Sequence, residues 1–166
     1  MGSDILPSLI IIVICIILSA YFSATETAFS SLNKTKIKTM AEKGQKRAKL
    51  VCNLVDEYDK LISTILIGNN IVNILLSSIG TVLFVKIYGN IGATISTVVV
   101  TIVVLIFGEI TPNSIAKDFP EKFAVFSAPL INFFIIIFTP LNFIFTQWKK
   151  FISKFFRIKK DIGMSQ

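Results

Sequence analysis

The sequence predicts an all-α membrane protein with three transmembrane helices, a cytoplasmic helical hairpin and a juxtamembrane or re-entrant helix. Hydrophobic residues make up 53% of the 166 positions, which is more than a soluble domain of this size carries. Several runs without a charged residue approach the roughly 20 residues that a helix needs to cross a bilayer. Basic residues gather between and after these runs, a pattern typical of membrane topology and anionic lipid contact, so we expect no nucleic-acid partner.

The composition argues against an enzyme. The chain contains no histidine, so it lacks the commonest transition-metal ligand and the usual proton relay at neutral pH. Its two cysteines, Cys15 and Cys52, lie far apart without a metal-binding spacing, and a disulfide between them is not expected. No nucleophile–base pair and no phosphate-binding loop is present, so we expect no catalytic residues and no enzymatic activity.

The first apolar run covers residues 5–24 and leads into a polar motif. Ser19, Ser23 and Glu26 follow one another at helical positions i, i+4 and i+7, so they share one face of the predicted helix. This places a carboxylate on the polar stripe of an otherwise apolar helix. The alternative is that Glu26 lies just past the helix end and faces water.

Residues 34–60 have a different character. They hold eight of the 17 basic residues and four acidic ones, and their apolar positions recur at spacings of three, four or seven, as in an amphipathic helix. Gly44 and Gln45 form the natural break. We therefore predict two short helices that make a hairpin at the membrane surface.

The second apolar run covers residues 61–85 and the third covers residues 91–108. In the second run Asn70 and Asn73 lie at i and i+3 and share a helix face, which Ser63 and Ser77 extend. Serine and asparagine in membrane helices most often hydrogen-bond between helices, and this alternative stays open for each residue taken singly.

The third run ends in Gly108-Glu109-Ile110-Thr111-Pro112. A carboxylate at the end of an apolar run is costly in hydrocarbon, which makes Glu109 a candidate functional residue; pairing with Lys117 is the alternative. Pro112 has no N–H to donate to the carbonyl of Gly108, so we predict a helix break there. A free carbonyl beside a carboxylate provides two ligands of the kind that hard cations prefer.

The last apolar run, 123–148, is long enough to cross the membrane. If the hairpin is cytoplasmic and this run does not cross, 16 of the 17 basic residues lie inside and only Lys86 lies outside. If the run crosses, six basic residues move outside, against the positive-inside rule. Pro129 and Pro140 also disfavour one straight spanning helix. We predict three crossings, an outside N-terminus, a cytoplasmic C-terminus and a juxtamembrane or re-entrant final segment.

Three motifs in this order carry a family resemblance: 23–28 (SATETA), 68–70 (GNN) and 108–112 (GEITP). Together with the hairpin they resemble the membrane domain, also called DUF21, of the CNNM/CorC magnesium transporters. The resemblance covers nearly the whole chain and would make residues 1–160 one domain, with 161–166 as a tail. Asn113 departs from the pattern, because the family usually has a basic residue there. The chain also stops before the cytoplasmic CBS domains that normally follow.

The resemblance implies a homodimer in the cell membrane that exports Mg²⁺, coupled to Na⁺, from a site facing the cytoplasm. Membrane lipids and, in the full-length protein, CBS domains are the other expected partners. The rival interpretation is a membrane scaffold or sensor that binds a divalent cation structurally and transports nothing. The oxygen donors expected to hold the cation come from three separate segments: Ser19, Ser23, Glu26, Asn70, Asn73, the Gly108 carbonyl and Glu109.

Overall fold

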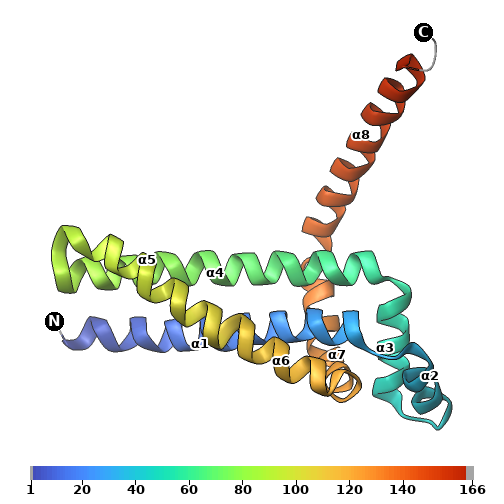
Figure 1. Cartoon of the computed structure of the whole chain (residues 1–166), viewed down its shortest axis with the longest axis horizontal. Coiled ribbons are helices and arrows are strands. Elements are labelled where there is room, and N and C mark those ends of the chain that lie inside the picture. Colours follow the sequence, from blue (N-terminus) through green and yellow to red (C-terminus); the bar gives the residue numbers. More distant parts are fainter. Residues whose placement is uncertain (1, 164–166) are drawn as a thin grey trace.

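The computed structural model describes residues 2–163, and every regular element in that range is helical. The chain order runs from one long apolar helix through a short hairpin to a second long hairpin and two final helices (Figure 1). The elements are α1 (Gly2–Ser31), α2 (Lys34–Glu42), α3 (Lys46–Asp56), α4 (Tyr58–Tyr88), the 3₁₀ turn η1 (Gly89–Ile91), α5 (Gly92–Val103), the π-helix η2 (Val104–Ile110), α6 (Thr111–Asp118), α7 (Pro120–Ile137) and α8 (Thr139–Gly163).

Within the described residues 2–163, three helical stretches are long and apolar enough to cross a membrane: Gly2–Ser31, Tyr58–Asp118 and Pro120–Ile137. The second stretch turns back on itself at η1, so α4 and the α5–η2–α6 arm run in opposite directions (Figure 1). Helix α1 packs against both of these arms. The fold is therefore that of an all-α membrane protein, as predicted.

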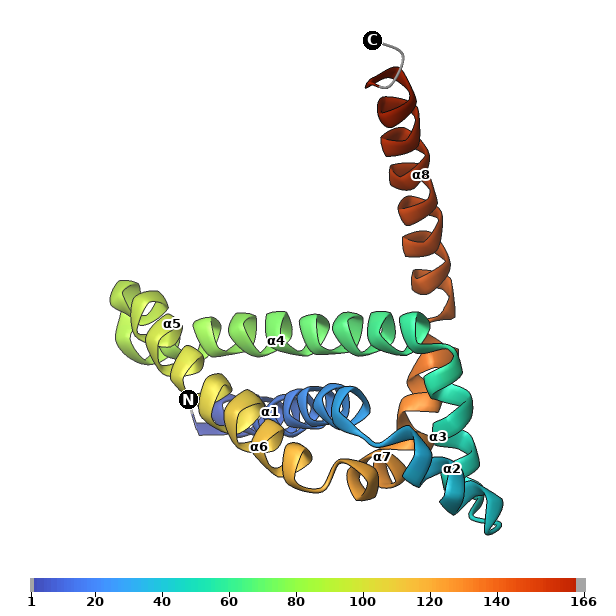
Figure 2. The ribbon, with the colours of Figure 1, turned by 45° about the vertical axis from the view of Figure 1, so that its right-hand side comes forward.

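Helix α7 has a different orientation. In both views it runs at a steep angle across α1 and α4 instead of beside them (Figures 1 and 2). The Tyr21 hydroxyl donates a hydrogen bond of 2.7 Å to the Ser127 carbonyl and so ties α1 to α7. The buried face of α7, which includes Ala124, Ala128 and Ile131, packs into the core. If α1 and α4 span the bilayer, α7 lies closer to the membrane plane, which fits the predicted non-spanning segment.

The final apolar segment differs from the prediction in its boundaries. It was expected as one helix over 123–148, but the chain forms two helices that meet at Phe138. Pro140 stands in the first turn of α8, where a missing N–H costs no helical hydrogen bond. Pro129, in contrast, lies inside α7 without ending it. Helix α8 continues to Gly163, so the expected tail at 161–166 is helical as far as the structure describes it; residues 164–166 lie outside the described range.

The predicted hairpin is present as α2 and α3. The Asn33 side chain begins α2 by accepting hydrogen bonds from the N–H groups of Thr35 and Lys36, at 3.0 and 3.2 Å. Gly44 lies between the helices with φ of +94°, a conformation that favours glycine. Ile37 and Val51, one from each helix, are buried. The break was therefore predicted at the residue where it occurs.

The contact between α1 and α4 depends on a glycine. A methyl group at Gly68 would overlap the ring of Phe22, which is fully buried in the core. We expect Gly68→Ala to lower the free energy of unfolding by about 1–3 kcal/mol, the usual cost of overpacking a core. Thermal or chemical unfolding in detergent measures this loss.

A double-mutant cycle tests the cause. In a Phe22→Ala background the ring is gone, so Gly68→Ala should cost much less there than in the parent. An equal cost in the two backgrounds would contradict the proposed contact.

Candidate cation site

Ser19 is the centre of a polar cluster inside the helical bundle. Its hydroxyl lies 2.9 Å from the Oδ1 atom of Asn73 and 3.3 Å from the Oδ1 atom of Asn69. The Asn73 amide also donates to Asn69 Oδ1, at 3.3 Å. Ser19 is fully buried, while both asparagines are half-buried. Helices α1 and α4 therefore bring one hydroxyl and two amide oxygens together.

The third helical arm reaches the same place through Gly108. This residue is buried in η2, and a methyl group on it would lie 3.0 Å from the Ser19 hydroxyl oxygen. Glycine therefore lets the η2 backbone approach α1 more closely than a side chain would allow. Ser19, Asn73 and Gly108, three of the predicted ligands, are thus neighbours through Ser19.

The predicted helix break at Pro112 is wrong, because the chain stays helical through α6. The perturbation comes earlier and takes the form of a π-helix over Val104–Ile110. The N–H of Thr111 reaches back to the Ile106 carbonyl, five residues away. This wider turn moves the hydrogen-bond register by one residue, so the helix passes Pro112 without stopping.

The π-helix changes which carbonyls are free. The N–H of Thr111 is used by Ile106, and Pro112 has none. The carbonyl oxygen of Phe107 therefore has no N–H four or five residues later, and the carbonyl oxygen of Gly108 can accept only from Asn113, at i+5. The segment thus leaves the Phe107 oxygen without a helical partner, whereas an α-helical register would have left the Gly108 oxygen free, as predicted from Pro112.

The two candidate carboxylates are half-buried, Glu26 on α1 and Glu109 directly after Gly108. Within residues 2–163 neither carboxylate forms an ion pair or a hydrogen bond, and the alternative pairing of Glu109 with Lys117 does not occur. Ser23 is buried one helical turn after Ser19, and it too lacks a hydrogen bond from its hydroxyl in the described part of the chain. These groups remain available to a ligand.

Asn70 does not lie where the prediction put it. Its side chain is exposed, and Asn69 takes its place beside Ser19. Asn69 and Asn70 each lie within about 60° of Asn73 around the helix. Helical spacing alone therefore places either of them on the same face as Asn73. The rotation of α4 decides between them, and Gly68 must face Phe22 for the helices to pack. The missed signal was the i, i+4 pair of Asn69 and Asn73.

Asn113 was noted only as a departure from a family pattern. In the structure its Oδ1 atom is buried and has no hydrogen-bond donor among the described residues. A buried amide oxygen without a partner is uncommon and calls for a reason. It follows Pro112 directly, so it adds a further unpaired oxygen to this region of α6.

The chemistry of the donors is distinctive. No group of three or more His, Cys, Asp or Glu side chains within residues 2–163 could hold a metal ion. The clustered donors are instead hydroxyl, amide and carbonyl oxygens, with single carboxylates nearby. Oxygen-only sets of this kind suit hard cations such as Mg²⁺, Ca²⁺ or Na⁺ and not Zn²⁺ or Cu²⁺.

Comparison with known proteins identifies the family. Residues 10–164 match the family described as the cyclin M transmembrane N-terminal domain, CNNM. The chain belongs to the CNNM family. The matched residues include Ser19 on α1, the hairpin, α4 and the π-helix η2, so the cation site lies wholly within the CNNM domain.

Curated relatives of this CNNM domain are longer proteins. The inner membrane protein YfjD of Escherichia coli, a UPF0053 protein, is 41% identical over 148 residues, which cover 89% of this chain and 35% of that protein. A UPF0053 protein of Haemophilus influenzae is 40% identical over 92% of this chain and 36% of its own length. The polyamine export protein of Haemophilus influenzae is 27% identical over 98% of this chain and 41% of its own length. The chain thus spans about a third of the first two relatives.

Proposed function

We propose that this CNNM domain is the membrane part of a Mg²⁺ transporter that exports the ion, coupled to Na⁺. The observation that carries the proposal is the convergence of Ser19, Asn69, Asn73 and Gly108 from three helical arms onto one buried position. A site shared by three arms can be opened or closed when one arm moves. A structural metal site needs no such arrangement.

Charge selectivity would come from the carboxylates. Mg²⁺ prefers about six oxygen ligands at roughly 2.1 Å and gives up its water reluctantly. Neutral oxygens alone do not replace that hydration, so Glu109, next to Gly108, supplies the negative charge, with Glu26 and Ser23 as further ligands. Release then requires a second conformation in which at least one arm withdraws its ligands.

The proposal includes a topology. With α2 and α3 in the cytoplasm, the N-terminus lies outside, and η1 with Lys86 faces the exterior. Two copies form the transporter, each with its own site, and CBS domains belong to the full-length protein. The named relative in the inner membrane of Escherichia coli supports a cell-membrane location.

Cysteine labelling in intact cells tests this topology. In a background without Cys15 and Cys52, we expect Lys46→Cys and Lys154→Cys to resist a membrane-impermeant thiol reagent, because both lie on the cytoplasmic side. Asn90→Cys should react, because η1 is outside. All three positions are exposed in the structure, so burial does not explain protection. Labelling of position 154 as fast as position 90 would show that the C-terminal helix lies outside.

A second candidate cargo is a polyamine, because one relative is named a polyamine export protein. The same hydroxyl, amide and carboxylate oxygens accept hydrogen bonds from ammonium groups. Mg²⁺ needs these oxygens around one point, whereas a diamine needs two separated acceptor groups. A competition experiment separates the two cargoes. If the cargo is a polyamine, an added polyamine should displace bound Mg²⁺ at micromolar to millimolar concentration. If the cargo is Mg²⁺, the added polyamine should leave Mg²⁺ binding unchanged.

Flux measurement separates transport from the scaffold interpretation. We expect proteoliposomes that contain the chain to move Mg²⁺ in a Na⁺-dependent manner, and Ser19→Ala combined with Asn73→Ala to abolish both binding and flux. A scaffold or sensor would bind Mg²⁺, lose binding in the same variant and show no flux in either form.

A further inference from the structure

A second polar region lies away from the cation site, where α4 and α8 begin. A cleft of about 450 Å³ separates the first turns of the two helices. Its polar lining includes Asp59, Lys60, Ser63, Asn142 and Lys149, and Phe143 contributes an apolar wall. A cleft lined both by charged groups and by phenyl rings suits an amphipathic ligand.

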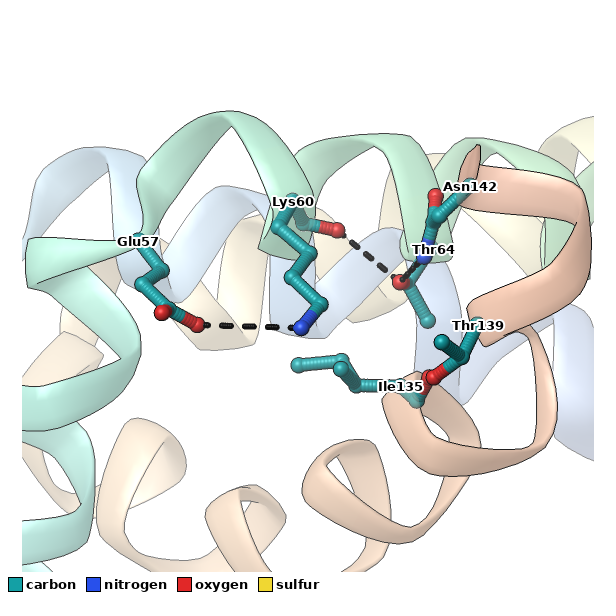
Figure 3. A network of polar contacts seen from close by, with 6 residues as sticks. All are labelled: Glu57, Lys60, Thr64, Ile135, Thr139 and Asn142. Atoms are coloured by element: carbon teal, nitrogen blue, oxygen red, sulfur yellow. Dashed lines mark hydrogen bonds and ion pairs between the residues drawn. The ribbon is translucent and has the colours of Figure 1, made fainter. Parts of the chain in front are cut away.

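Asn142 holds an unused acceptor at this cleft. The Thr64 hydroxyl donates its proton to the Lys60 carbonyl, at 2.9 Å, so it can only accept from Asn142. The Asn142 Nδ2 atom supplies that hydrogen bond at 2.8 Å (Figure 3). The orientation of the amide follows, and its Oδ1 atom points away from Thr64. That oxygen is buried and has no hydrogen-bond donor within residues 2–163, and the residue as a whole is only 7% exposed.

Lys149 supplies positive charge to the same cleft. Its ammonium lies 3.8 Å from the Asp59 carboxylate, with 75% of the lysine side chain exposed. Such a surface pair is weak and leaves ammonium N–H donors free. Lys60 points toward Glu57, 3.9 Å away, so it is not assigned to the ligand (Figure 3).

The position of α8 indicates where the ligand comes from. The helix runs across the direction of α1 and α4 in both views, as a helix in the membrane plane would (Figures 1 and 2). It carries large exposed apolar residues such as Phe143, Phe145 and Trp148, together with six basic residues from Lys149 to Lys160. Basic amphipathic helices of this type lie at the headgroup level of anionic membranes.

We propose that this cleft binds one anionic phospholipid with a hydroxyl-bearing headgroup, of the phosphatidylglycerol type. Lys149 contacts the phosphate, and a headgroup hydroxyl donates to Asn142 Oδ1. The acyl chains leave along the exposed ring of Phe143. The lipid thereby fixes the angle between α4 and α8, independently of the ion that the bundle carries.

Lipid binding to the chain in detergent, counted by native mass spectrometry, tests this site. We expect phosphatidylglycerol to bind at least about tenfold more tightly than phosphatidylcholine, as one charge-assisted hydrogen bond allows. Lys149→Ala should remove this preference. Lys150→Ala is the matched control, because Lys150 is the next residue on the same exposed helix but does not line the cleft. The proposal would be overturned if Lys149→Ala and Lys150→Ala lost this lipid preference equally. It would also be overturned if the parent bound phosphatidylglycerol no more tightly than phosphatidylcholine.

Two further comparisons define the headgroup. Phosphatidylethanol has the same charge but no headgroup hydroxyl, so it should bind more weakly than phosphatidylglycerol in the parent and equally in Asn142→Leu. Soluble glycerol 3-phosphate should not compete at matched concentration, since it lacks the acyl chains. Equal binding of the two lipids to the parent would remove Asn142 from the site, and effective competition by glycerol 3-phosphate would identify a free phosphate site instead.

Discussion

Replacing Glu109 with glutamine is expected to lower the affinity for Mg²⁺ by at least about 100-fold. Glutamine keeps the shape and one oxygen but removes the negative charge of the residue that follows Gly108. Even the loss of a group that contacts a metal ligand indirectly costs about 10–100-fold in metal affinity, and a charged ligand in a half-buried position should cost no less. Mg²⁺-dependent stabilisation against heat measures the effect, because it depends on the affinity of the folded state alone.

The control for this experiment is Glu42→Gln, which removes one negative charge from an exposed position on α2. It should leave Mg²⁺ stabilisation unchanged. The melting temperature of Glu109→Gln without Mg²⁺ should stay at the parental value, because Glu109 makes no ion pair or side-chain hydrogen bond within residues 2–163. Parental Mg²⁺ stabilisation in Glu109→Gln would exclude Glu109 as a ligand.

Replacing Pro112 with alanine is expected to move stability and affinity in opposite directions. The new N–H can pair with the Phe107 carbonyl at i+5 or with the Gly108 carbonyl at i+4, which now has only Asn113 as a helical donor. Alanine is also favoured over proline inside helices by up to about 3 kcal/mol, so the Mg²⁺-free protein should be at least as stable as the parent. Mg²⁺ should bind about tenfold more weakly, because a charge-assisted backbone contact to the ion is lost. Unfolding with and without Mg²⁺ gives both quantities.

Pro129→Ala provides the matched control. Pro129 is also inside a helix, but it is exposed on α7 and contributes nothing to the cation cluster. Its replacement by alanine should raise stability in the same direction as Pro112→Ala, because both prolines lie inside helices. It should leave Mg²⁺ affinity as in the parent. If Pro112→Ala also retains parental affinity, the backbone carbonyls of η2 are not ligands.

Local patterns predicted several features of this fold closely. Gly44 was identified as the break in the hairpin, and it has the positive φ that favours glycine at such a break. Ser19 was identified from its helical spacing and from the apolar surroundings that make a hydroxyl conspicuous. The non-spanning character of the last apolar run, inferred from the basic residues and from Pro129 and Pro140, stays a prediction, because Pro120–Ile137 is long and apolar enough to cross. In each case the deciding information lies within a few turns of one helix or in the distribution of charge.

Other features depend on contacts between distant segments. Local periodicity did not distinguish Asn69 from Asn70, because both share a helix face with Asn73. Likewise Pro112 indicated a free carbonyl, but the chain accommodated it through a π-helix over Val104–Ile110 and not through a break. The π-helix lies where η2 packs closely against Ser19 of α1. Gly108 makes this close packing possible, because it has no side chain.

The sequence by itself determined the membrane class, the order of helices, the presence of the helical hairpin and the segments that carry hard oxygen donors. These properties follow from hydropathy, charge and helical period, which act locally. Only the tertiary structure decided which oxygens meet. The spacing of residues sets angles within a helix, but the rotation of α4 about its own axis is set by packing of Gly68 against the ring of Phe22. The rotation that places Gly68 against this ring also turns Asn69 toward Ser19 and leaves Asn70 exposed.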